Sequence, residues 1–250
     1  MEPRGPKLMD FLISVVTWLA DPAHWQGSDG IPVRLVEHVE LSGASLAVAV
    51  AIALPIGLLV GHANRGGFVV LNLANVGRAL PSLAILGLAL PFTIRATGQL
   101  DFWPTFVALV VLAVPPILTN TYIGIREVDR ETIEVARGMG MDGPEVLRRV
   151  ELPIALPVLL GGIRTAAVQV VATATLGAFV AGGGLGRYII DGIALQETER
   201  IFVGAALVAL LALVTEAFLG WLERRAVSPG LRPRLEPLVG VGAAAGATSR

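Results

Sequence analysis

The chain has 250 residues, of which 54% are hydrophobic and only 16% are charged, and its mean hydropathy is +0.72. Soluble domains usually carry about 25% charged residues, so this composition excludes an ordinary soluble protein. The sequence has no cysteine, which excludes a disulfide framework and a thiolate metal site, and its formal net charge of −1 indicates no class of partner.

The first apolar segment, Leu8–Ala20, is only about 13 residues long and is flanked by Asp10 and Asp21. A helix needs about 20 apolar residues to cross a bilayer core. The segment also lacks the compact basic start and the small-residue cleavage site of a signal peptide. We interpret it as an amphipathic helix at the membrane interface, with a short sixth span as the alternative. Trp18 and Trp25 suit the headgroup layer.

Long segments without charged residues follow, and their lengths suit five transmembrane helices. The segments are Leu41–Val60, Ala79–Ile94 extended backwards through Val69–Gly77, Trp103–Gly124, Thr165–Gly186, and Ile201–Thr215 continued past Glu216 to Leu222. The sequence therefore predicts an all-α integral membrane protein. Its parts would be an N-terminal external or interfacial segment (residues 1–36), a transmembrane domain (37–225) and a disordered cytoplasmic tail (226–250).

The distribution of basic residues predicts how these spans are oriented in the membrane. If residues 124–156 face the cytoplasm, thirteen of the 19 basic residues, Arg65, Arg78 and Arg164 among them, lie on the cytoplasmic side and six lie outside. Cytoplasmic loops of membrane proteins carry an excess of arginine and lysine. We therefore expect the N-terminus outside and the C-terminus in the cytoplasm.

A polar, glycine-punctuated segment, residues 126–156, lies between the third and fourth predicted spans. Residues 131–139 predict a short helix with acidic side chains in its first turns, where the helix dipole favours them. Gly140 suits the left-handed residue that ends such a helix. A solvated amphipathic loop is the alternative, although a loop of this size and regularity is more often functional.

A second short helix is predicted directly after Gly140. Asp142 or Gly143 can cap its start, and Pro144 would occupy its first position. Pro153 and Pro157 are then expected to turn the chain back toward the membrane. The whole segment is thus predicted to form a helical hairpin that lies across the cytoplasmic face.

The spacing within this hairpin resembles the signature of permease subunits in binding-protein-dependent ABC importers. That signature is Glu-Ala-Ala, three residues, Gly, nine residues, Ile, one residue and Leu-Pro. The positions that are identical here are Glu134, Ala136, Gly140, Leu152 and Pro153. Val135 stands in place of Ala and Val150 in place of Ile, and both changes are mild.

Three further stretches, residues 79–84, 120–125 and 182–189, resemble the osmoprotectant branch of these permeases. That branch serves the uptake of glycine betaine, carnitine, choline or proline betaine. The resemblance thus implies a permease subunit of an ATP-driven importer for such solutes. The alternative is a permease for methionine or another small polar solute.

The resemblance also implies a MetI-like bundle of about five transmembrane helices in a bacterial inner membrane, paired with a second copy or a sister permease. The hairpin would dock on a cytoplasmic ABC ATPase dimer, and an extracytoplasmic binding protein would deliver the solute. Glu134 and Arg137 would supply polar contacts, Ala136 and Gly140 close approach, and Leu152-Pro153 a fixed elbow. Asp142 completes the set of coupling residues.

The residues themselves indicate that ATP binds elsewhere. A P-loop needs a lysine that reaches the phosphates, and the only lysine is Lys7. Gly182–Gly186 is glycine-rich but follows a predicted span, so we interpret it as an outer-face turn that starts a short helix. We expect a transport subunit rather than an enzyme, with no cofactor of its own and no nucleic-acid partner.

Candidate residues for the translocation path are uncharged polar groups inside the spans, which prefer protein or water to lipid. They are Ser82, Asn120, Thr121, Tyr122, Gln169, Thr173 and Thr175. Hydrogen bonding between helices is the alternative role for them. A secondary carrier would need intramembrane acids, of which only Glu216 qualifies, and a membrane scaffold would not need ATPase-stimulated flux.

Overall fold

The computed structural model describes residues 8–228, and every regular element within that range is helical. The α-helices are α1 (Leu8–Ala20), α2 (Ile31–Ala63), α3 (Gly67–Ala79), α4 (Ser82–Thr97), α5 (Trp103–Arg126), α6 (Arg130–Gly138), α7 (Gly143–Val146), α8 (Leu152–Thr173), α9 (Gly186–Leu195) and α10 (Thr198–Ala226). The shorter helical turns are η1 (Pro22–Trp25), η2 (Leu147–Glu151) and η3 (Ala174–Val180). The tail predicted over residues 226–250 lies outside the described residues from 229 onward.

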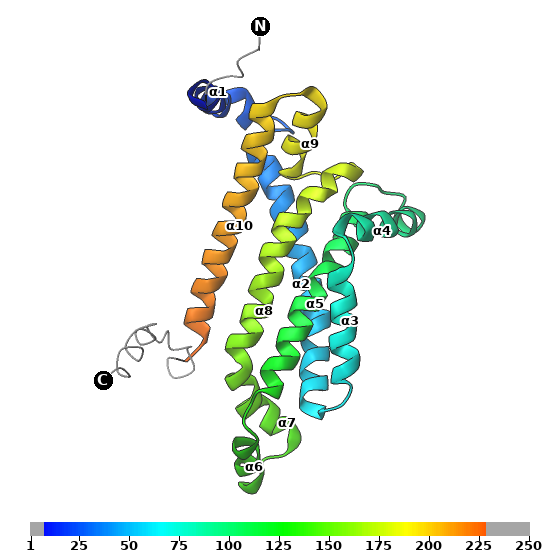
Figure 1. Ribbon diagram of the computed structural model, residues 1–250, viewed down its shortest axis with the longest axis vertical. Helices are drawn as coiled ribbons and strands as arrows, with labels where there is room; N and C mark the ends of the chain where they lie inside the picture. Colours follow the sequence, from blue (N-terminus) through cyan, green and yellow to red (C-terminus); the bar gives the residue numbers. More distant parts are fainter. Residues whose placement is uncertain (1–7, 229–250) are drawn as a thin grey trace, which may run out of the picture.

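Four of the described helices are long and apolar enough to cross a membrane: α2, α5, α10 and the continuous helix Gly143–Val180. α3 and α4 together form a fifth apolar segment, which bends by 95° between them. The long helices run alongside one another, with α6 at one end of the bundle and α1 and α9 at the other (Figure 1). The prediction of an all-α bundle with about five spans is confirmed.

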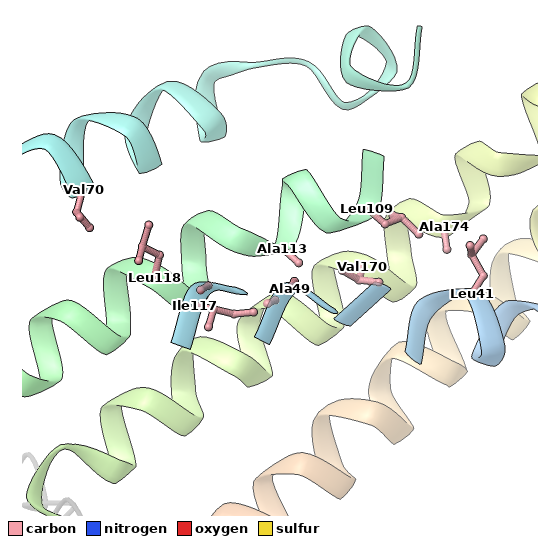
Figure 2. Packing of buried hydrophobic residues seen from close by; sticks show 11 residues of the cluster. Leu41, Ala49, Val70, Leu109, Ala113, Ile117, Leu118, Val170 and Ala174 are labelled. Carbon is pink, nitrogen blue, oxygen red and sulfur yellow. The ribbon is translucent and has the colours of Figure 1, made fainter. Parts of the chain in front are cut away.

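α5 is the central helix of the bundle, because α2, α3, α4 and α8 all pack against it. The main hydrophobic cluster joins α2, α3, α5 and α8 through a mixture of small and branched side chains (Figure 2). Ala49 of α2 and Ala113 of α5 are both fully buried, and Ile117 and Val170 fill the space beside them. Small residues allow membrane helices to approach closely and gain van der Waals contact.

The fourth span differs from its predicted bounds of Thr165–Gly186. One helix runs without interruption from Gly143 to Val180, so it includes α7, η2, α8 and η3. The predicted span begins after Arg164, because the prediction places spans on segments without charged residues. In the structure Arg164 lies within α8, where two glutamates of α10 neutralise its charge. The predicted turn at Pro153 and Pro157 is also wrong, because both residues lie inside α8.

The second predicted span is broken where the sequence suggested one continuous helix. Leu80 adopts an extended conformation, and Pro81 follows it as the N-cap of α4. Proline disfavours a helical conformation in the residue before it, which accounts for the break. Arg78, which the count of basic residues assigns to the cytoplasmic side, lies in the last turn of α3. Its neighbour Gly77 packs against Pro115 in the middle of α5.

The end of the bundle that carries α9 is closed by a glycine loop held on α2. The Gly184 amide donates a hydrogen bond to the Glu37 carboxylate at 2.7 Å, and the Leu185 amide donates to His38 at 3.3 Å. Gly184 has φ +81°, a conformation that suits glycine. The interpretation of Gly182–Gly186 as a turn that starts a short helix is confirmed by α9.

α1 lies across the start of α10 at this same end of the bundle (Figure 1). Phe11 packs edge-to-face on Phe202 at 5.4 Å between ring centroids, and the Ser14 hydroxyl donates to Glu199 at 3.0 Å. Leu8 and Val16 remain 75% and 66% exposed. A helix of 13 residues is about 20 Å long, so α1 is too short to cross a bilayer alone.

Candidate functional site

The hairpin begins with α6, and local side chains fix both of its ends. The Asp129 carboxylate caps the start by accepting a hydrogen bond from the Glu131 amide at 3.1 Å. At the other end the Met141 amide donates back to the Ala136 carbonyl at 3.2 Å, and Gly140 has φ +89°. This is the 6→1 bond and left-handed glycine of a Schellman C-cap. The conformation predicted for Gly140 is therefore confirmed.

α7 starts as the sequence predicted. The Asp142 carboxylate accepts a hydrogen bond from the Glu145 amide at 2.8 Å, and Pro144 lies in the first turn, where its missing N–H is not needed. Asp142 is thus a helix cap. Val146 is fully buried and Ala136 is 2% exposed, and α6 packs on α7 and η2. Ala136 therefore contributes to the packing inside the hairpin, and its part in close approach to a partner stays a prediction.

The Leu152-Pro153 pair is not an elbow. The preceding turn, η2, is a π-helical turn, in which the Leu152 amide donates to the Leu147 carbonyl five residues earlier. A proline removes one helical hydrogen bond and crowds the carbonyl four residues before it. The wider π turn accommodates Pro153 without bending the helix out of line, and such turns are frequent at functional sites. The hairpin is consequently continuous with the span α8.

A hydrogen-bonded contact between Glu151 and His62 joins this π turn to the end of α2. Glu151 is 4% exposed, and its carboxylate lies 2.6 Å from Nδ1 of His62. A polar pocket surrounds the pair, with walls from the end of α5 and from α6, where Glu134 and Arg137 line it. Burying a carboxylate is costly unless it is paired. The pair therefore fixes the position of the hairpin relative to the bundle.

We expect Glu151→Ala to loosen the hairpin, because it leaves His62 without its buried partner. The loss of a buried hydrogen-bonded group costs about 1–3 kcal/mol, so trypsin should cleave after Arg137 about tenfold faster than in the native protein. Glu145→Ala is the matched control, since Glu145 pairs with Arg149 at 3.6 Å on the exposed surface. Equal cleavage rates in the two variants would contradict the anchoring role of Glu151.

The outward side of α6 carries two apolar side chains that sequence reasoning overlooked. Val135 is 62% exposed and Met139 is 68% exposed, and their i, i+4 spacing places them on one side of the helix. Glu134 and Arg137 are also exposed, but they lie on another side of α6, where they line the polar pocket. The signal was present in the sequence as an apolar pair in an otherwise polar helix. An exposed apolar pair with charged neighbours is the composition of a protein-contact surface.

The predicted path residues of α5 point to three different neighbours. A Cβ atom built at Gly162 of α8 would lie 2.5 Å from the Asn120 Cβ, and one at Gly57 of α2 would lie 2.7 Å from the Thr121 Cβ. Tyr122 packs its hydroxyl against α3 at Gly67. Asn120, Thr121 and Tyr122 therefore occupy helix contacts within this chain and form no shared wall. Their assignment to the path stays a prediction.

The other predicted path residues lie on different elements. Ser82 is half-buried at the start of α4, and Gln169 and Thr173 are half-buried on α8. Thr175 lies in η3, where its hydroxyl donates to the Ala172 carbonyl at 2.9 Å and its backbone packs on Gly186. Their role also remains a prediction. Within residues 8–228, no group of three or more acidic or histidine side chains is placed to hold a metal ion.

Arg164 and Glu216 form one charged cluster with Glu223. The Arg164 guanidinium lies 3.2 Å from the Glu216 carboxylate and 2.9 Å from that of Glu223. The cluster joins α8 to α10. Since an intramembrane charge is expensive unless it is paired, these contacts explain how α8 carries an arginine between two apolar stretches.

The comparisons with known proteins agree with this geometry. Residues 53–228 match the family described as "Binding-protein-dependent transport system inner membrane component". The choline transport system permease protein OpuBB of Bacillus subtilis is 39% identical over 205 residues, which cover 82% of this chain and 92% of that protein. The osmoprotectant import permease protein OsmY of Salmonella typhimurium is 38% identical over 228 residues, which cover 88% of this chain and 94% of that protein.

The fold is similar to that of a solved ABC transporter. A chain of the methionine transporter MetNI, in inward-facing conformations, superposes with a TM-score of 0.73 at 24% identity, over 84% of this chain and all of that chain. This likeness concerns the fold alone. The matched residues 53–228 contain the hairpin, the π turn and four of the five apolar segments in full. The chain therefore belongs to the family of binding-protein-dependent transport system inner membrane components.

Proposed function

We propose that the chain is the permease subunit of an ATP-driven importer for osmoprotectants such as glycine betaine, carnitine, choline or proline betaine. The names of its relatives support this solute class: they include choline, carnitine and osmoprotectant permeases at 36–39% identity over most of the chain. The methionine alternative has weaker support, because the methionine transporter is similar at only 24% identity.

The exposed hairpin is the observation that carries the transport mechanism. Members of this family work with a separate ATPase and a substrate-binding protein. In our proposal α6 enters a cleft of the ATPase dimer, with Val135 and Met139 as apolar anchors and with Glu134 and Arg137 as polar contacts on another side of the helix. ATP binds to that partner, so this subunit needs no cofactor. The continuous helix Gly143–Val180 would carry the motion of the hairpin into the membrane.

The proposed orientation places the hairpin in the cytoplasm of a bacterium, and α1 and α9 at the outer face of the inner membrane. The binding protein would then deliver the solute at the end closed by the loop Gly182–Gly186. A second copy or a sister permease would complete the path, because one bundle of this size has a densely packed centre around α5 and not an open channel.

Solute uptake into vesicles tests this proposal. Vesicles that contain the full chain, its ATPase and its binding protein are supplied with labelled glycine betaine, carnitine, choline or methionine, with and without internal ATP. We expect ATP-dependent uptake of at least one osmoprotectant and none of methionine. ATP-dependent uptake of methionine alone would overturn the solute class, and uptake without ATP would overturn the importer mechanism.

A further inference from the structure

The exposed surface of α3 carries three polar side chains on one flank. α3 turns Val70 and Ala74 inward, where both are buried against its neighbours. On one flank of this buried stripe the exposed residues are Val69, Leu73 and Val76. On the other flank every third residue is polar and exposed, namely Asn72, Asn75 and Arg78, and the 82% exposed Phe68 and the half-buried Leu71 lie between them. We call the three polar residues the polar ridge.

The polar ridge ends near the middle of the membrane-spanning bundle. A Cβ atom built at Gly77 would lie 2.8 Å from Pro115, so the two helices touch there. Pro115 is central in α5, which runs from Trp103 to Arg126. Arg78, the next residue after Gly77, is therefore held near the mid-depth of the bilayer. An arginine at this depth makes insertion of the helix into the membrane costly.

Nothing in the described chain neutralises this charge. Arg78 has no hydrogen-bond or ion-pair partner among residues 8–228, in contrast to Arg164, which lies between two glutamates. An intramembrane charge that faces lipid without a partner is disfavoured, so such residues face a protein interior or a water-filled cavity. Arg78 therefore requires water or another polar group on its exposed side, whereas the Asn72 amide already donates a hydrogen bond to the Phe68 carbonyl at 2.7 Å.

The irregular backbone next to Arg78 also needs protein or water around it. The helix breaks at Leu80 and Pro81, and the chain turns by 95° into α4. Leu80 is 42% exposed in an extended conformation. Irregular backbone at membrane depth is tolerated only where it is buried in protein or lines an aqueous cavity. Broken helices near the midplane are also where transporters bind their solutes.

We propose that the polar ridge lines the translocation path and that Arg78 binds the carboxylate of a zwitterionic solute as it passes. This inference rests on the proposed function and adds a preference within it. Arginine pairs with a carboxylate through two parallel hydrogen bonds. Glycine betaine and carnitine carry a carboxylate, whereas choline carries only its positive charge and is repelled by the guanidinium. The path therefore favours carboxylated osmoprotectants over choline.

Thiol labelling tests the position of the ridge independently of the solute. The native sequence has no cysteine, so single-cysteine variants of the reconstituted complex have no background. Asn75→Cys and Arg78→Cys should react with a charged thiol reagent at least tenfold faster than Val76→Cys, because a thiol in lipid does not ionise. Val76 is the matched control, since it is 60% exposed on the apolar side at the same depth. Equally slow reactions would overturn the assignment.

Transport by Arg78 variants tests the carboxylate preference. We expect Arg78→Gln to lower glycine betaine uptake at least tenfold relative to choline uptake, and Arg78→Lys to keep part of the preference. The binding protein and ATPase are the same in all samples, and their co-purification with each variant checks the fold. Equal losses for both solutes would overturn the specificity role. If the native complex carries neither solute, the proposed function fails together with the carboxylate assignment, while labelling still decides whether the ridge lines the path.

Discussion

Replacing both Val135 and Met139 by aspartate should abolish ATP-driven uptake while leaving the bundle folded. These two side chains are more than 60% exposed on the outward side of α6, so aspartate disturbs no packing within the chain. Anchor residues at the centre of an interface contribute about 2 kcal/mol or more each. Losing two of them should weaken the affinity for the ATPase about a thousandfold, and the subunits should no longer co-purify.

Leu195→Asp is the matched control for this experiment. Leu195 is 60% exposed at the end of the short helix α9, at the opposite end of the bundle from α6. The control should retain the ATPase, which is measured by co-purification in detergent. If the Val135 and Met139 variant also keeps the ATPase and transports at the native rate, the docking surface lies elsewhere on the chain.

A second large effect is expected at Gly162, where α8 touches α5. A Cβ atom at this position would lie 2.5 Å from the Asn120 Cβ and 3.0 Å from the Pro116 carbonyl oxygen. Gly162→Val must therefore push the two helices apart, and overpacking of this kind costs about 3 kcal/mol. The variant should unfold at a markedly lower temperature in detergent and should elute as aggregate in size-exclusion chromatography.

The neighbouring residue provides the control for Gly162. A Cβ atom at Gly161 meets no atom of the described chain within 4 Å, so Gly161→Val adds volume without a clash. Valine also forms helices better than glycine, by a few tenths of a kcal/mol. Gly161→Val should therefore unfold at or slightly above the native temperature. A similar loss in both variants would show that helix conformation, and not the α5–α8 contact, sets the effect.

The features that the sequence predicted well are those decided by neighbouring residues. The end of α6 and the start of α7 follow from Gly140 and Asp142, because caps depend on a few adjacent groups. The number of spans follows from the length of apolar segments. The match between the hairpin spacing and a known family also needed only local information.

The features that it missed depend on contacts between distant segments. Prolines 81 and 153 look alike in sequence, yet the first breaks a helix and the second lies inside one, because a π turn precedes it. The placement of Arg164 required its partners on α10, which lie more than 50 residues further along the chain. Likewise, the exposure of Met139 on α6 and of Arg78 on α3 depends on what each helix packs against. The sequence alone does not show these contacts, so it could not assign a role to either residue.

Because the helix Gly143–Val180 is continuous, it can transmit motion from one end of the bundle to the other. Its 38 residues extend about 57 Å at 1.5 Å per residue, from the hairpin to the loop that Glu37 and His38 hold. Arg164 lies near its midpoint and pins it to α10 through Glu216 and Glu223. A rigid rod fixed near its centre moves its two ends in opposite directions. A sideways push of the ATPase on α7 would therefore swing η3 the opposite way and pull on the outer loop, so that one tilt closes one face as it opens the other.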